Sequence, residues 1–72
     1  MDKKHLLIVD DDERIRTLLE RFLVEKNYRV TIASNSKKAR SLVEMIIFDL
    51  AIVDVMMPGE DGLSLTKYLT ST

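Results

Sequence analysis

Two uninterrupted apolar runs predict the buried strands of this chain. They cover residues 6–9 and 50–53, and each ends directly at an aspartate, Asp10 in one case and Asp54 in the other. A continuous apolar run of this length, with β-branched residues toward its end, is typical of a strand covered on both faces. We therefore expect two doubly buried strands with acidic residues at their carboxyl ends.

Between these runs, apolar residues recur at helical spacing in two segments. The first helix has Asp11 or Asp12 as its cap and Asn27 as its left-handed end, and the second follows the cap-forming cluster 34–36. The positions on the apolar face are Ile15, Leu18, Leu19, Phe22 and Leu23 in the first helix and Ala39, Leu42, Val43 and Ile46 in the second. The polar face of the first helix is expected to carry Arg14, Arg16, Glu20, Arg21 and Glu25.

An alternating segment and a last helical segment complete the pattern. Residues 28–33 alternate, with Val30 and Ile32 separated by polar neighbours, which predicts a half-buried strand at a sheet edge. Residues 57–62 have the composition of a turn. Apolar positions 65, 68 and 69 then begin a third helix.

The order of these elements predicts the fold class. Strands and helices alternate as βαβαβα, the pattern of an α/β protein with a parallel sheet and helices on both faces. Because the alternating strand suits an edge, we expect the strand order 2-1-3, with the two apolar strands as neighbours. Residues 1–72 contain no linker composition, so one domain is expected.

Composition excludes several classes of protein. The 72 residues, 8.3 kDa in mass, contain no cysteine, which rules out a disulfide scaffold. Hydrophobic residues make up 46% and charged residues 32% of the chain, as in ordinary globular domains and unlike disordered tails. A net charge of -1 gives no basic surface for nucleic acid, and no apolar run is long enough to cross a membrane. A cytoplasmic protein is expected.

The acidic residues after the two apolar runs are the candidate site. If those strands are parallel neighbours, Asp10, Asp11 and Asp54 converge at the edge of the sheet where α/β proteins bind ligands. Crowded carboxylates at a hydrated position suit Mg²⁺ and phosphate chemistry. The simpler interpretation, helix capping, accounts for the triplet 10–12 but not for Asp54. The single histidine, His5, is expected at the solvent edge and not as a catalytic base.

Three motifs at these positions resemble a known family. They are Leu-Leu-Ile-Val-Asp-Asp-Asp at 6–12, Phe-Asp-Leu-Ala-Ile-Val-Asp at 48–54 and Val-Met-Met-Pro-Gly-Glu-Asp-Gly at 55–62. Together they resemble the receiver domain of bacterial two-component response regulators, which has a flavodoxin-like, CheY-like fold. The helix spacing also resembles the subclass that carries a winged-helix DNA-binding output domain.

The resemblance implies a role for each acidic residue. Asp54 would accept a phosphoryl group from a sensor histidine kinase. Asp11 would bind Mg²⁺ directly, Asp10 largely through water, and the backbone carbonyl of Met56 would be a further ligand beside Asp54. The protein would then be a phosphoacceptor signalling module and not an enzyme, with transcription regulation as the output of the whole protein.

The resemblance covers the first part of a receiver domain, so residues 1–72 are expected to form a partial one. Receiver domains have later strands that end in a Ser or Thr and in a Lys that contacts the phosphoryl group. Ser64 and Lys67 fall on the third helix instead, and impaired phosphorylation is therefore expected. The third strand would also be left as an exposed apolar edge, which predicts self-association, by edge pairing or element exchange, into a homo-oligomer such as a dimer.

Two other functions compete with this interpretation. The Asp10-x-Asp12 pattern is close to the nucleophile motif of haloacid dehalogenase-type phosphohydrolases. That motif requires Thr or Val two residues after its second aspartate, where this chain has Arg14, and it leaves the Met-Pro-Gly turn unexplained. The other alternative is an interaction module, an α/β half-domain that dimerises and never carries phosphate.

Overall fold

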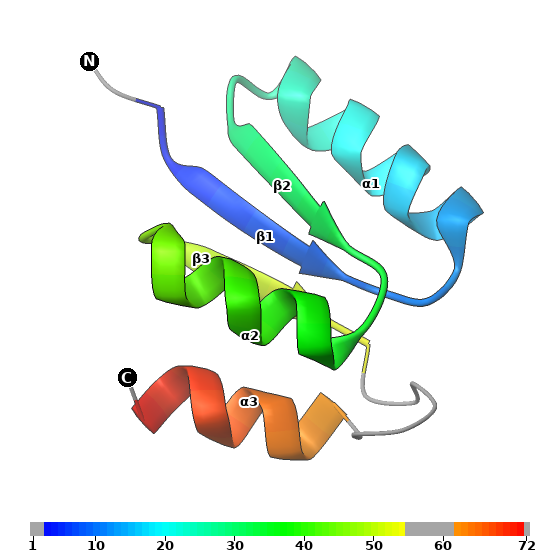
Figure 1. The fold of residues 1–72 in the computed structure, drawn as a ribbon. Coiled ribbons are helices and arrows are strands. Elements are labelled where there is room, and N and C mark those ends of the chain that lie inside the picture. Colours follow the sequence, from blue (N-terminus) through cyan, green and yellow to red (C-terminus); the bar gives the residue numbers. More distant parts are fainter. Residues whose placement is uncertain (1–2, 55–61, 72) are drawn as a thin grey trace.

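Three strands and three helices alternate along the chain, as the sequence pattern predicts (Figure 1). The structure is a computed structural model that describes residues 3–54 and 62–71. The elements are β1 (His5–Val9), α1 (Glu13–Glu25), β2 (Arg29–Ala33), α2 (Ser36–Met45), β3 (Leu50–Val53) and α3 (Gly62–Ser71). The turn predicted at 57–62 lies outside the described residues except for Gly62, which begins α3.

The sheet is parallel, with β1 between β2 and β3. Val9 at the end of β1 is level with Ala33 of β2 and with Val53 of β3. The predicted strand order 2-1-3 is therefore confirmed. Because all three strands run the same way and end at the same level, the residues that follow them meet at one edge of the sheet.

Helices cover both faces of the sheet (Figure 1): α1 packs on β1 and β2 from one side, and α2 and α3 lie together on the other. The core lies on the α2 and α3 side, where Leu7 and Val9 pack against Ala33, Ala39 and Leu65. Successive side chains of a strand point to opposite faces, so Leu6 and Ile8 are buried on the α1 side. The prediction that β1 is covered on both faces is confirmed.

β3 differs from the prediction of a second doubly buried strand. Leu50 is 57% exposed, and the residues from Ala51 to Val53 are only half-buried. Ala51 and Val53 pack against the core, whereas α1, the described helix on the opposite face of the sheet, packs on β1 and β2. β3 is an edge strand of the described sheet, as expected from the sequence.

α1 begins and ends as predicted but buries a different stripe. Asp12 is its N-cap, and Asn27 has a φ of 74°, the left-handed conformation that ends many helices. On the predicted apolar face of α1, Ile15, Leu18 and Phe22 are exposed. The half-buried positions are Leu19 and Leu23, together with Arg16 and Glu20 from the predicted polar face. The helix is rotated toward β1 and β2 and turns its remaining apolar stripe away from the sheet.

α2 and α3 pack against each other over the core. The Asn35 side chain caps α2 by accepting a hydrogen bond from the Lys38 amide, at 2.8 Å. The Arg40 guanidinium lies over the ring of Tyr68, 4.1 Å from its centroid, and so links the two helices. Each helix that the structure describes is too short or too polar to cross a bilayer.

Candidate metal centre

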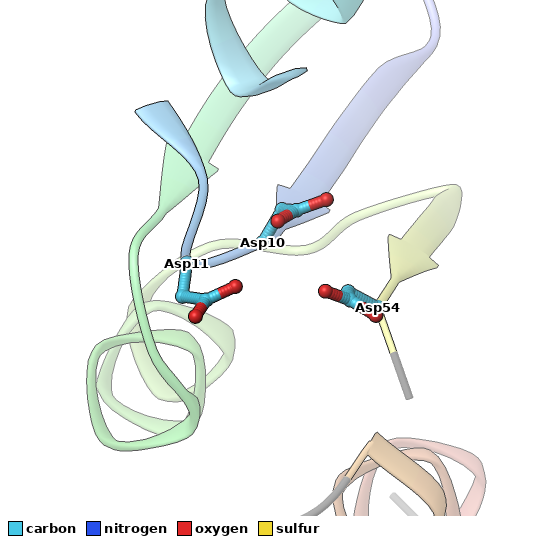
Figure 2. A group of neighbouring side chains, drawn as sticks. All are labelled: Asp10, Asp11 and Asp54. Carbon is cyan, nitrogen blue, oxygen red and sulfur yellow. The ribbon is translucent and has the colours of Figure 1, made fainter. Parts of the chain in front are cut away.

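The carboxylates of Asp10, Asp11 and Asp54 come together at the carboxyl edge of the sheet. Each contributes an oxygen to a group in which all three oxygens lie within 4.8 Å of one another. Figure 2 shows the carboxylates of Asp11 and Asp54 pointing toward one another, with Asp10 beside them. Asp11 is exposed, whereas Asp10 and Asp54 are half-buried. The convergence predicted from strand order is therefore present in the structure.

Backbone hydrogen bonds continue the strand pairing into this site. The Asp10 amide donates to the Ala33 carbonyl at 3.2 Å, and the Asp54 amide donates to the Val9 carbonyl at 2.9 Å. Both aspartates are thus held by the neighbouring strand at the point where regular pairing stops. The parallel register of the sheet places Asp54 opposite Asp10.

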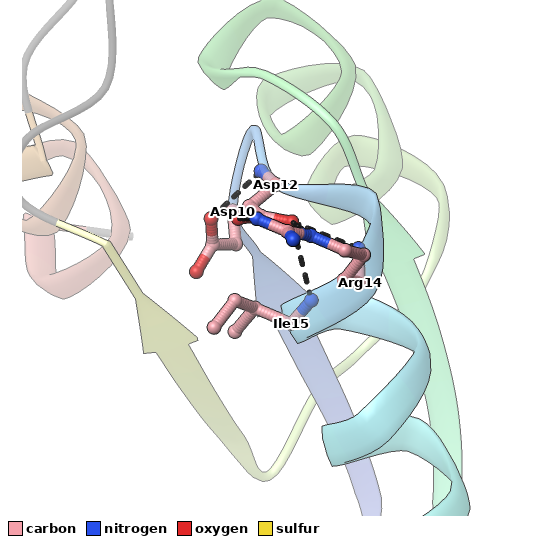
Figure 3. A network of polar contacts seen from close by, with 4 residues as sticks. All are labelled: Asp10, Asp12, Arg14 and Ile15. Carbon is pink, nitrogen blue, oxygen red and sulfur yellow. Dashed lines mark hydrogen bonds and ion pairs between the residues drawn. The ribbon is translucent and has the colours of Figure 1, made fainter.

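Asp12 has a different role from its two neighbours. Its carboxylate accepts hydrogen bonds from the amides of Arg14, at 2.9 Å, and Ile15, at 3.4 Å, and its own amide donates to Asp10 Oδ1 at 2.9 Å (Figure 3). Hydrogen bonds from the side chain and then the backbone of Arg14 lower the pKa of Asp12 below its ordinary value of 3.8. Of the two predicted caps, Asp12 is the cap of α1, and Asp11 remains available to the acidic cluster.

Arg16 contacts the site without belonging to the acidic cluster. Its Nη1 donates a hydrogen bond of 2.8 Å to the Asp10 carbonyl. Sequence reasoning missed this residue because it placed Arg16 on the solvent face of α1. The signal that was available is the spacing, since Arg16 lies three and seven residues before Leu19 and Leu23, on one face of the helix.

His5 lies at the opposite end of the sheet from the acidic cluster. The sequence predicted a residue at the solvent edge, whereas the structure half-buries it. It is the first residue of β1, is half-buried, and its Nε2 lies 2.7 Å from Thr31 Oγ1. Its ring packs edge-on against Phe48, with centroids 4.8 Å apart. The His5 amide donates to Asp49 Oδ2 and its carbonyl accepts from the Asp49 amide, both at 2.8 Å. These contacts connect the beginning of β1 with the middle of β2 and with the residue before β3.

The acidic cluster fits a small, hard cation. Two oxygens bound to one Mg²⁺ lie at most about 4.2 Å apart, twice its usual distance to oxygen of about 2.1 Å. The three oxygens, within 4.8 Å of one another, need only a small adjustment to reach that spacing. The exposure of Asp11 leaves room for the water molecules that Mg²⁺ retains. Met56, the remaining predicted ligand, lies outside the described residues.

Sequence comparisons identify relatives of the chain. Residues 6–72 match the family described as the response regulator receiver domain. PetR from Rhodobacter capsulatus is 57% identical over 65 residues, which are 90% of this chain and 27% of PetR. The transcriptional regulatory protein ResD from Bacillus subtilis is 38% identical over 64 residues, 89% of this chain and 27% of ResD. The chain thus spans about a quarter of the length of these curated relatives.

Solved structures share the fold. The chemotaxis protein CheY4 from Vibrio cholerae matches with a TM-score of 0.94 and 28% identity, over 97% of this chain and 58% of CheY4. The response regulator TrrA from Thermotoga maritima, solved with Mg²⁺ and BeF, matches with a TM-score of 0.90 and 35% identity, over 94% of this chain and 59% of TrrA. TrrA solved in complex with the histidine kinase ThkA matches with the same identity and TM-score, over 96% of this chain and 60% of TrrA.

Proposed function

Because this chain belongs to the response regulator receiver family, we propose that it is a phosphoacceptor module of two-component signalling, with Asp54 as the phosphoacceptor. The observation that carries the proposal is the approach of Asp54 to Asp10 and Asp11 within 4.8 Å. Asp54 follows directly after β3 with its amide bonded to Val9 and is half-buried, so its backbone has a fixed position and its carboxylate an approach from solvent. A nucleophile needs both.

The proposed reaction is a phosphoryl transfer to a carboxylate. An Asp54 oxygen attacks the phosphorus of a phosphohistidine, a phosphorus–oxygen bond forms, and the phosphorus–nitrogen bond breaks with its electron pair remaining on the histidine nitrogen. The product is an acyl phosphate on Asp54. The phosphoryl group remains on the chain as a signal, so the protein acts as an acceptor and not as an enzyme with turnover.

Asp10 and Asp11 would hold Mg²⁺ beside this nucleophile, with the Met56 carbonyl as the further ligand that the family resemblance implies. A bound Mg²⁺ would supply positive charge against the carboxylates and the phosphoryl oxygens. The two aspartates directly follow β1 and lie beside Asp54, so they need little reorganisation to act as ligands. The structure of TrrA with Mg²⁺ and BeF supports this assignment by similarity.

A sensor histidine kinase is the proposed partner. TrrA, which is 35% identical to this chain, has been solved in complex with the histidine kinase ThkA. Transcription regulation is the proposed output of the whole protein, because ResD, at 38% identity, is named as a transcriptional regulatory protein. A winged-helix output domain and a cytoplasmic location, both expected from the sequence, remain proposals.

Ser64 and Lys67 are not part of the proposed phosphorylation site. The family resemblance implies that a Ser or Thr and a Lys at the ends of later strands contact the phosphoryl group. In this chain Ser64 and Lys67 are exposed positions of α3 and do not follow a strand. Neither residue is therefore proposed to contact the phosphoryl group.

The chain is also proposed to self-associate through β3. A groove of about 750 Å³ between β3, α2 and α3 is lined mainly by apolar residues, among them Ile46, Ile47 and Leu69. Ile47 is 93% exposed, and β3 has one strand neighbour in the described sheet. Burying an apolar surface and pairing the free edge of a strand both favour association with a second copy.

Incubation with acetyl phosphate and Mg²⁺, followed by intact mass measurement, tests the proposed function. The unchanged chain is expected to gain the mass of one phosphoryl group, and Asp54→Asn is expected to gain none. Asp49→Asn is the matched control, because Asp49 precedes β3 as Asp54 follows it. Steady release of phosphate that depends on Asp10 would favour the phosphohydrolase instead, and the absence of any adduct would favour the pure interaction module.

A further inference from the structure

Arg16 is a charged residue on the side of α1 that packs toward the sheet. It is half-buried on the stripe of α1 that contains Leu19 and Leu23, whereas the Arg14 side chain is 92% exposed. Among residues 3–54 and 62–71, Arg14 and Asp12 form an ion pair but Arg16 forms none. The contact that the Arg16 guanidinium makes is the 2.8 Å hydrogen bond to the Asp10 carbonyl. A partly buried charge that donates to a backbone carbonyl restricts the position of that carbonyl.

Asp10 is held through each of its polar groups. Its amide donates to the Ala33 carbonyl at the end of β2, and its Oδ1 accepts from the Asp12 amide. Its carbonyl accepts from Arg16. The first two contacts are the continuation of the sheet and a local turn. Only the third connects this residue to the second turn of α1, six residues further along the chain.

We propose that Arg16 is a positioning residue for the acidic site. By holding the Asp10 carbonyl, it fixes the turn between β1 and α1 and so presents Asp10 and Asp11 to Asp54. The inference deepens the proposed function and rests on it. A guanidinium suits this task because it is always charged and offers several donors in a rigid plane, whereas a lysine would offer a flexible point charge.

Loss of the anchor that Arg16 provides and loss of its positive charge predict opposite changes in Mg²⁺ affinity. A cation near three carboxylates repels Mg²⁺, so removing only its charge would tighten Mg²⁺ binding. Removing the anchor of the turn lets the ligands spread, which weakens binding. Variants of residues that orient metal ligands typically lose about 10- to 100-fold in metal affinity. The sign of the change therefore separates the two roles.

Titration of the 72-residue chain with Mg²⁺ by calorimetry tests the proposal. Arg16→Gln is expected to bind Mg²⁺ about 10-fold more weakly, and Arg16→Lys to bind with an affinity between those of Arg16→Gln and the unchanged chain. Arg21→Gln is the matched control, because it removes the same charge from an exposed position of the same helix. Its affinity is expected to stay within about twofold, since exposed charges are well screened.

Amide hydrogen exchange at Asp12, measured without metal, gives a second and independent readout. Exchange is expected to be faster in Arg16→Gln than in the unchanged chain, because the turn that protects this amide loses its anchor. If Arg16→Gln loses its helical circular dichroism signal, the variant is unfolded. The Mg²⁺ affinity of Arg16→Lys, which keeps the net charge, then tests the proposal. Binding by the folded Arg16 variants that equals or exceeds that of the unchanged chain would overturn the inference and leave the proposed function intact. An unchanged chain that binds no Mg²⁺ would overturn both.

Discussion

The amide of Asp54 donates to the carbonyl of Val9 across 2.9 Å, one residue beyond the last paired position of β3. This bond links the end of one acidic strand to the end of the other. It explains why a residue 44 positions after Asp10 in the sequence shares a cluster with it. The site is thus a direct product of the parallel register between β1 and β3.

The buried face of α3 is predicted to decide the stability of the chain. Leu65 is fully buried in the core, whereas Leu63 on the same helix is 65% exposed. Leu65→Ala is expected to lower the free energy of unfolding by about 2–5 kcal/mol, most of what a single small core supplies. Leu63→Ala is expected to change it by less than about 0.5 kcal/mol. Urea denaturation measures both, and equal losses would show that α3 does not pack as described.

The capping of α1 by Asp12 predicts a dependence of stability on pH. Hydrogen bonding in the folded chain lowers the pKa of Asp12. The contribution of Asp12 to the free energy of unfolding is therefore present above its ordinary pKa of 3.8 and is lost as pH falls through the lowered pKa. Asp12→Asn keeps an oxygen acceptor for the helix but has no charge to lose. The difference in unfolding free energy between the two chains is therefore expected to shrink in acid, below about pH 4.

Other carboxylates also titrate in this range, so the difference between two chains is the informative quantity and a single curve is not. Glu44→Gln provides the control, because Glu44 is an exposed residue of α2. Its difference from the unchanged chain is expected to stay small throughout. A difference for Asp12→Asn that grows as pH falls would contradict the capping role.

The free edge of β3 predicts self-association that can be disrupted at one position. Leu50 in this strand is 57% exposed and lines the apolar groove. Sedimentation velocity at micromolar concentration is expected to show a species larger than the monomer for the unchanged chain. Leu50→Lys is expected to be monomeric, because a charged side chain on an edge strand opposes pairing with another chain.

Leu18→Lys serves as the control for this prediction, since Leu18 is 66% exposed on α1, away from β3. It is expected to associate like the unchanged chain. A shift to monomer in Leu18→Lys alone would assign the association to α1 and not to β3. A folded, monomeric unchanged chain would contradict self-association altogether.

Much of this fold could be predicted from sequence because apolar runs and alternation are direct consequences of burial. The continuous run at 6–9 indicated a central strand, and the alternating segment indicated an edge, which together determined the strand order. The strand order in turn brought Asp10 and Asp54 to one edge. Each of these steps depends on local pattern and on the general geometry of parallel sheets.

What could not be predicted depends on tertiary neighbours. The apolar stripe of α1 is wider than the surface it covers, so periodicity alone did not show that Leu19 would face the sheet and Phe22 would face outward. The partial exposure of β3 follows from where α1 packs, which no pattern within β3 records. The bond from Arg16 to the Asp10 carbonyl depends on the path of the backbone between β1 and α1.

Locating the phosphoryl group on the chain tests the central claim most directly. After incubation with acetyl phosphate and Mg²⁺, fragmentation mass spectrometry is expected to place the group on Asp54, and the yield is expected to fall sharply when a chelator removes Mg²⁺. Modification at another carboxylate, such as Asp49, or the same yield at Asp54 without Mg²⁺, would contradict an account in which Asp10, Asp11 and Asp54 act as one site.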